Sequence, residues 1–291
     1  MLDRIEKGTF SQEGAGVLGA GCLEFIGYFW YHSRPMLRLS TRQQSILNRV
    51  VDAYIETAQP VGSRLITELY QRLYRSSYSP ATVRHEMGRL EELGYLTHPH
   101  TSAGRIPTDL GYRYYVDHGL SLENLPDELL GDVEEQLKGI GNGVDSVADR
   151  VASLLTALSG EISLVLFPVV RNRVSDTEKT YSLVIMGTSR ILEKPEFQDI
   201  QKVKRVFKAL DEKKEMVEWI SSRIPKEGVQ ISIGRENEQN AFWECTMIST
   251  RCSVGKGCEG TMALFGPKRM RYGRLIPLLK QVSRLMNWVL P

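Results

Sequence analysis

The sequence predicts an α+β protein in which an N-terminal winged helix-turn-helix is followed by a domain with a mainly antiparallel sheet. Three short amphipathic helices and a hairpin-like segment occupy residues 40–118, and strand-like runs mixed with helices begin near residue 162. The chain has 291 residues, of which 42% are hydrophobic and 25% are charged. This composition excludes collagen-like, coiled-coil and wholly disordered proteins, and the length allows two domains.

Two helices at the start are predicted by apolar residues that recur at helical spacing. Thr41 is expected to cap the first helix, which ends before the helix-breaking run Gln59-Pro60-Val61-Gly62. Ser63 is expected to cap the second helix. The inward residues of this second helix are expected to be Leu65, Ile66, Leu69 and Leu73.

A third helix is predicted from Ser79 to Gly94, because Ser79-Pro80 combines an N-cap with proline at the first helical position. Its apolar stripe consists of Val83, Met87, Leu90 and Leu93. Its opposite face carries Ala81, Arg84, His85, Gly88, Arg89 and Glu92. Three short helices with tight connections match a helix-turn-helix, whose last helix enters the major groove of DNA.

The third helix therefore has a candidate base-reading face. Arg84, His85 and Arg89 are expected at base edges, because arginine forks suit guanine. Ala81 and Thr82 would allow close approach to a thymine methyl group. The alternative is a solvated helix face with incidental arginines, since such helices also occur in proteins that bind no DNA.

The segment from Tyr95 to Pro107 predicts a β-hairpin, the wing, with a polar tip. Thr101, Ser102 and Arg105 are expected against sugar-phosphate or a minor groove. The pair His98 and His100 lacks a third nearby donor and is a weak metal site. Thr108 is expected to cap a helix whose tyrosines pack the wing onto the core, the alternative being that they stack on bases.

The charges also bear on DNA binding. Residues 36–118 contain ten arginines, eight acids and no lysine, which favours bidentate contacts over a diffuse basic surface. Ser63 and Ser79, with nearby amides at helix N-termini, are expected to hold phosphates, and Arg64 is expected to contact the DNA. Residues 121–160 carry eight acids against two bases, in two helices that could connect domains or pair with a partner chain.

The C-terminal half predicts strands at residues 162–170, 181–186, 229–233, 244–253 and 260–265, with helices at 197–210, 213–224 and 270–290. The last 25 residues hold six bases and no acid. This basic helix could bind anionic lipid or DNA, but its apolar residues favour packing on the sheet with Arg274, Lys280 and Arg284 in solvent.

An enzyme is disfavoured, since no histidine follows His118 and Gly255-Lys256-Gly257 lacks the spacing of a P-loop. We expect no cofactor and no metal.

The cysteines and the N-terminal stretch bear on the location of the protein. It is expected to be cytoplasmic, with reduced thiols at Cys22, Cys245, Cys252 and Cys258. The apolar stretch 14–30 contains glutamate and five glycines, so no membrane span is expected, and residues 1–35 are interpreted as disordered or as lying upstream of a start at Met36.

Several runs resemble the bacterial heat-inducible transcription repressor family HrcA. The runs are residues 79–87, 90–96 and 100–108, with Pro60-Val61-Gly62-Ser63 upstream and the segment 266–272 (GPKRMRY) near the end. The resemblance implies a winged helix followed by a GAF-like domain. It further implies a homodimer that represses chaperone operons through an inverted-repeat operator, CIRCE, and whose active form is maintained by the GroE chaperonin.

One feature departs from the family pattern. Family members carry an inserted dimerisation domain before the segment resembling residues 181–187, and here only residues 171–180 fill that gap. The expected division is an extension (1–35), a winged-helix DNA-binding domain (36–120), an acidic connector (121–160) and a GAF-like regulatory or dimerisation domain (161–291). The expected function is repression of heat-shock operons, and the alternative is a ligand-sensing or protein-interaction regulator with another operator.

Overall fold

The computed structural model describes residues 38–74, 78–100, 103–138, 144–169, 180–224, 227–254 and 258–289. Residues from Leu39 onward belong to one compact unit. The predictions for residues 1–35, for the stretch 14–30, for Thr101 and Ser102 and for most of 171–180 lie outside the described residues. In the part of the chain that is described, none of the helices has the length and apolarity needed to cross a membrane.

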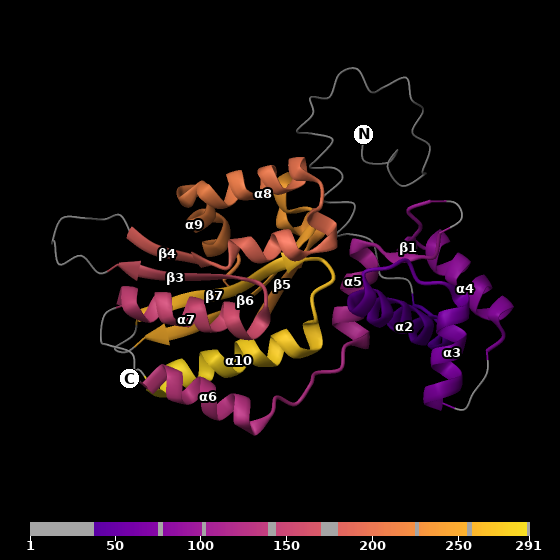
Figure 1. The fold of residues 1–291 in the computed structure, drawn as a ribbon, viewed down its shortest axis with the longest axis horizontal. Helices are drawn as coiled ribbons and strands as arrows, with labels where there is room; N and C mark the ends of the chain where they lie inside the picture. The colour runs from indigo at the N-terminus through magenta and orange to yellow at the C-terminus, as the bar shows by residue number, and fades with distance from the viewer. Residues whose placement is uncertain are drawn as a thin grey trace, which may run out of the picture. The chain divides into compact units, whose positions relative to one another are not determined.

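The N-terminal part of this unit contains three helices followed by a small hairpin (Figure 1). The helices are α2 (Thr41–Thr57), α3 (Ser63–Tyr74) and α4 (Pro80–Glu92). The wing strands β1 (Leu96–Thr97) and β2 (Ile106–Pro107) pair antiparallel, and α5 (Asp109–Tyr114) follows, continued by a wider turn at Tyr115–Gly119. The predicted winged helix-turn-helix is therefore confirmed.

Local capping differs from the prediction at two helices. Ser40, and not Thr41, caps α2, because the Ser40 hydroxyl accepts the N–H of Gln43 while the Gln43 side chain accepts the N–H of Ser40. Ser63 is the first residue of α3 and so does not cap it. Leu65 is 38% exposed, because Ile66, Thr67 and Tyr70 form the buried face of α3.

The C-terminal part is a five-stranded sheet. Its strands are β3 (Ile162–Val169), β4 (Thr180–Met186), β5 (Val229–Ile233), β6 (Cys245–Val254) and β7 (Cys258–Pro267). The strand order is β4-β3-β7-β6-β5, and every neighbouring pair is antiparallel. Each of these strands lies within three residues of its predicted range at either end, and the α+β fold class is confirmed.

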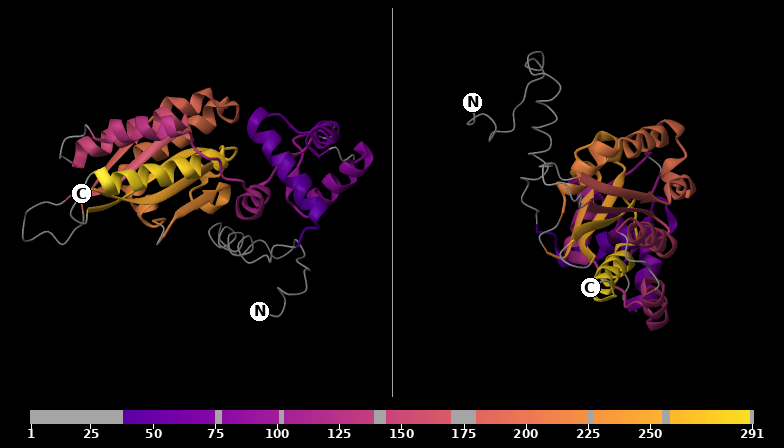
Figure 2. Two further views of the ribbon diagram at one scale, coloured as in Figure 1. Left: turned by 90° about the horizontal axis from the view of Figure 1, so that it is seen from below. Right: turned by 90° about the vertical axis from the view of Figure 1, so that its left-hand side faces the viewer.

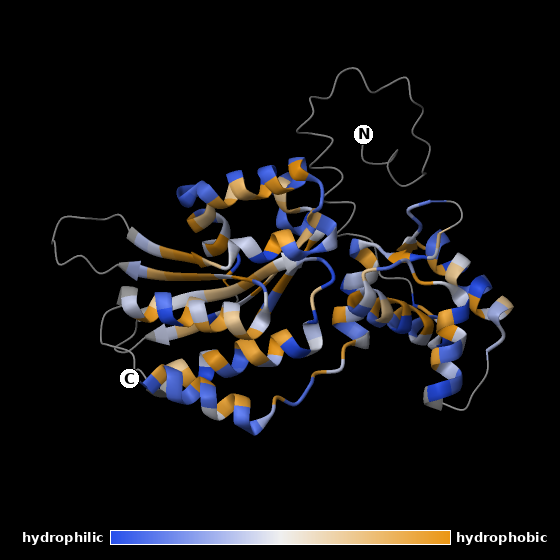
Figure 3. Cartoon of the chain, in the orientation of Figure 1, coloured by the Kyte–Doolittle hydropathy of each residue, from blue (hydrophilic) through white to orange (hydrophobic). Residues whose placement is uncertain are grey.

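Helices cover both faces of the sheet (Figures 1 and 2). One layer holds α7 (Val144–Ser159) and α10 (Tyr272–Val289), with α6 (Asp127–Lys138) against α10. The other layer holds α8 (Ile200–Asp211) and α9 (Lys213–Ser221). These helices carry apolar and polar residues along their length, as Figure 3 shows by colour. They are amphipathic because only one side of each faces the sheet.

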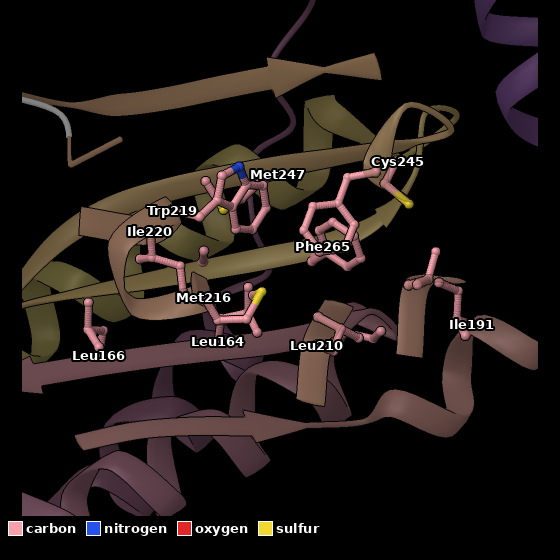
Figure 4. Packing of buried hydrophobic residues seen from close by; sticks show 14 of the residues in the cluster. Leu164, Leu166, Ile191, Leu210, Met216, Trp219, Ile220, Cys245, Met247 and Phe265 are labelled. Carbon is pink, nitrogen blue, oxygen red and sulfur yellow. The ribbon is translucent and has the colours of Figure 1, made fainter. Parts of the chain in front are cut away.

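The core between the sheet and α8 and α9 contains aromatic and sulfur-containing side chains from five elements (Figure 4). Alternate residues of β3, namely Ile162, Leu164 and Leu166, point into this cluster. Ser163, which lies between them, donates instead to the carbonyl of Ala152 on α7, 2.6 Å away. The alternation assigns one face of β3 to each helix layer.

Two expectations about charged segments change in the structure. In the expected connector 121–160, α7 buries Val151, Ala152 and Leu155 against the sheet and is therefore a layer of the sheet domain. In the basic tail, Lys280 and Arg284 are exposed and the apolar face of α10 is buried, as predicted, whereas Arg274 is half-buried. Four short 3₁₀ turns, Thr188–Glu193, Pro195–Phe197, Gly234–Asn237 and Asn240–Phe242, were not predicted.

Gly111 allows α5 to approach the wing closely. A Cβ at this position would lie 2.2 Å from the carbonyl oxygen of Tyr95. Gly111→Ala is therefore expected to lower the free energy of unfolding by about 2–3 kcal/mol in urea titrations. Gly131→Ala on α6 is the matched control, since nothing lies within 4 Å of its Cβ. The free energy of unfolding of the control is expected to rise by about 0.5–1 kcal/mol. Equal losses in both variants would contradict the steric argument.

Candidate nucleic-acid interface

The start of α4 is fixed by its cap. The Ser79 hydroxyl accepts the N–H of Thr82 at 3.1 Å, and Pro80 occupies the first helical position, as the sequence predicted. Val83, Met87 and Leu90 are buried, and Leu93 is half-buried. This packing determines which side of α4 faces away from the core.

The outward side of α4 presents the predicted base-reading residues together. Ala81, Arg84, His85 and Arg89 are exposed, and Thr82 is half-buried. Arg89 forms an ion pair with Glu92, at 3.0 Å between Nη1 and Oε2, with both side chains at least 60% exposed. Within the described residues Arg84 has no ion pair. The guanidinium of Arg84 is therefore available to donate hydrogen bonds to another molecule. The exposed ion pair of Arg89 is weak, so Arg89 can exchange Glu92 for another acceptor.

The base of the wing is joined to the loop before α3. The N–H of Val61 donates to the carbonyl of Arg105 at 2.8 Å, and the N–H of Arg105 donates back to Val61 at 2.9 Å. A Cβ on Gly104 would lie 2.6 Å from the backbone of Val61, which explains why glycine stands there. The two sequence runs 60–63 and 100–108 thus meet at this point.

The wing is also attached to α4 through Glu91. One carboxylate oxygen of Glu91 lies 2.7 Å from Nε of Arg105, and the other contacts Nδ1 of His98. These two residues flank the wing tip, so a single carboxylate holds both sides of the hairpin against α4. The role of Glu91 was not predicted from the sequence, because its partners are seven and fourteen positions away and no local pattern joins them.

The remaining predicted DNA-contacting residues lie at the N-terminus of α3. Ser63 is half-buried and Arg64 is exposed, without an acidic partner among the described side chains.

Arg42 is a further cation near α4 that was not predicted from the sequence. It lies over the ring of Tyr78, with 5.4 Å from Cζ to the ring centroid, and its Nη1 is 3.5 Å from Glu86 on α4. Arg42 therefore adds a half-exposed cation next to the capped end of α4.

The tyrosines of α5 pack inward. Tyr112, Tyr114 and Tyr115 are at most 7% exposed, and burial raises the pKa of each hydroxyl. Tyr114 packs edge-on against Tyr95 with ring centroids 5.4 Å apart. The expected packing of the wing onto the core is confirmed, and the alternative that these rings stack on bases is wrong, because no ring face is open.

Comparison with known proteins identifies the family. A family model described as "HrcA protein C terminal domain" matches residues 118–276, which is more than half of the chain. The chain belongs to the HrcA family. The resemblance of the sequence runs to HrcA is thereby confirmed, and membership of a family of transcription repressors agrees with the expectation that the protein is not an enzyme.

One curated HrcA relative is the heat-inducible transcription repressor HrcA of Shouchella clausii (strain KSM-K16). It is 28% identical to this chain, and the alignment covers 84% of this chain and 96% of the relative. The alignment extends over 335 residues, more than the 291 of this chain, so this HrcA relative contains residues without counterpart here.

A solved structure titled "Crystal structure of a hypothetical protein at 2.2 A resolution" has the same fold as this HrcA chain. The TM-score is 0.65 at 20% sequence identity, and the match covers 87% of this chain and 99% of that chain. This likeness concerns the fold alone.

Proposed function

We propose that this HrcA protein is a DNA-binding repressor of chaperone operons that binds a CIRCE-type inverted repeat as a homodimer and leaves it on heat stress. The observation that carries the proposal is the exposed face of α4, where Arg84 lies free one turn after the small residue Ala81. The name of the Shouchella relative supports repression and induction by heat. The site of action would be the cytoplasm, and GroE would be the partner that the family resemblance implies.

Each candidate residue has a proposed role at the DNA. Arg84, His85 and Arg89 read base edges, and Ala81 and Thr82 permit close approach. Ser63, Arg64 and Ser79 hold phosphates. Because the Arg105 guanidinium is held by Glu91, Arg105 anchors the base of the wing and leaves Thr101 and Ser102 to meet the sugar-phosphate backbone.

The proposed domains are a DNA-binding domain at 36–120 and a regulatory or dimerisation domain at 161–291, to which the helices at 121–160 contribute α7 as a layer. Repression would be steric occlusion of a promoter by a two-fold dimer. Its half-sites would lie one or more helical turns apart, because a two-fold protein matches an inverted repeat.

The test is fluorescence anisotropy with a labelled CIRCE-type duplex and a scrambled duplex of equal length. We expect selective binding to the inverted repeat, with affinity falling by about 10³-fold between about 50 and 200 mM salt if about six phosphates are contacted. Equal affinity for both duplexes, or none for either, would contradict the proposal and favour a ligand-sensing or protein-interaction regulator with a different operator.

A further inference from the structure

The segment 266–272 (GPKRMRY) contains Lys268, Arg269 and Arg271, which are three of the six bases in the last 25 residues. In the structure, its three cations are paired with acids far away in the chain. Lys268 Nζ lies 2.8 Å from Asp109, Arg269 contacts Glu196, and Arg271 lies 2.8 Å from Glu56. The Lys268 and Arg269 pairs are largely buried, whereas the Arg271 pair is exposed, so Lys268 and Arg269 are the cations of this segment that are held within the molecule.

Two of these partners belong to the winged helix. Asp109 is the first residue of α5, and its second carboxylate oxygen accepts the N–H of Arg235 at 3.0 Å. Glu56 lies in the last turn of α2, where the carbonyl of the neighbouring Ile55 also accepts from Arg269 at 3.2 Å. The segment thus contacts the winged helix at both α2 and α5.

Arg113 provides a second attachment from α5. Its Nε donates to Glu236 at 2.9 Å, and its Nη2 donates both to Glu236 and to the carbonyl of Ile231 on β5, the latter at 2.7 Å. The Arg113 and Glu236 side chains are 20% and 12% exposed. Burial lowers the pKa of Arg113, but the Glu236 hydrogen bond and charge outweigh it, so the net shift is upward and the charge is maintained.

The backbone at Gly234 approaches the Asp109 side chain closely. Gly234 has φ +56°, and a Cβ there would lie 2.2 Å from the Asp109 carboxylate. The connecting segment after α5 is also held, because the N–H of Glu123 donates to the carbonyl of Gly273 at 2.9 Å. Bidentate, largely buried ion pairs constrain geometry more than they add stability.

We propose that Asp109 and Arg113, through Lys268 and Glu236, are positioning residues that fix the orientation of the winged helix on the sheet domain. This proposal rests on the proposed function. Neither residue lies on the exposed face of α4, so neither reads a base. Their effect is that the two α4 helices of a dimer meet half-sites at one fixed separation, and specificity for operator spacing comes from this contact.

The test compares Arg113→Gln with the wild type on three probes: the full inverted repeat, a single half-site, and inverted repeats whose spacer is lengthened or shortened by one to three base pairs. We expect Arg113→Gln to lose about 10-fold or more in affinity for the full repeat and less than about 2-fold for the half-site, with a flattened dependence on spacer length. Arg113→Lys keeps the charge and is expected to restore much of the spacing preference. Arg190→Gln, in an exposed pair with Glu193, is the matched control and should bind as wild type.

Asp109→Asn is a second variant, which tests the proposal if Arg113→Gln does not fold. It retains an acceptor for the N–H of Arg235 but loses one of the two carboxylates next to Lys268, the other being Glu244 at 3.1 Å. Equal losses on the half-site and the full repeat would overturn the proposal, as would unchanged spacing preference in folded variants or a wild type without spacing preference. A wild type that binds neither the full inverted repeat nor the half-site would refute the proposed function instead.

Discussion

Trp219→Ala is expected to lower the free energy of unfolding by about 3–5 kcal/mol, because it removes the largest side chain from the core between α9 and the sheet. The indole, labelled in Figure 4 beside Phe265, is 4% exposed. Its ring centroid lies 4.7 Å from that of Phe242 and 6.1 Å from that of Phe265. Its Nε1 donates to the carbonyl of Asn237 at 3.0 Å. Alanine leaves a cavity and removes one of the two hydrogen bonds to this carbonyl, which also accepts the N–H of Gln239 at 2.6 Å.

Urea unfolding followed by far-UV circular dichroism measures this loss without relying on tryptophan fluorescence. Trp243→Ala is the matched control, because Trp243 is half-buried under the Arg235 guanidinium, 4.8 Å from the ring centroid. The control is expected to lose about 1 kcal/mol. Similar losses in the two variants would show that the core does not depend on Trp219.

Arg84→Ala is expected to weaken binding to the inverted repeat by about 1–3 kcal/mol and to relax the preference at one base position. Arg84 is exposed on α4 and has no ion pair within the described residues, so alanine would remove the proposed contact to DNA without disturbing the fold. The loss should be specific to the operator, because a base contact adds nothing on scrambled DNA.

Competition gels with single-base operator variants measure the preference. Arg284→Ala, which removes an exposed arginine from α10, is the control and should leave affinity and base preference unchanged. If Arg84→Ala discriminates operator variants as the wild type does, Arg84 has no reading role and the base-edge assignment moves to His85 and Arg89.

Features determined by neighbouring residues were predictable from the sequence. Ser79-Pro80 gave the start of α4 correctly, because a hydroxyl cap and a proline act within one turn. The same local reasoning placed the cap of α2 one residue too late, because Ser40 and Thr41 both carry a hydroxyl and only the reciprocal bond with Gln43 decides between them. Runs of β-prone residues located the five strands that the structure describes in this sheet.

Features that depend on distant partners were not predictable. Arg105 looked like a free DNA contact until Glu91 was found beside it, and Lys268 looked like part of a basic surface until Asp109 was found 159 positions earlier in the chain. Charge counts along a sequence cannot distinguish a free cation from a paired one. In the candidate interface, the sequence therefore identified the exposed face of α4 but not the contacts that hold it in place.

The strand order also determines when the protein can fold during synthesis. The central neighbours β3 and β7 pair Ile162 with Phe265, so the sheet cannot close until β7 has left the ribosome. The helices and wing before residue 120 contact near neighbours in sequence and can fold much earlier. The winged helix can thus form on the nascent chain before Lys268 and Arg271, which contact it, have been synthesised, and the proposed operator recognition would be complete only after that segment has emerged.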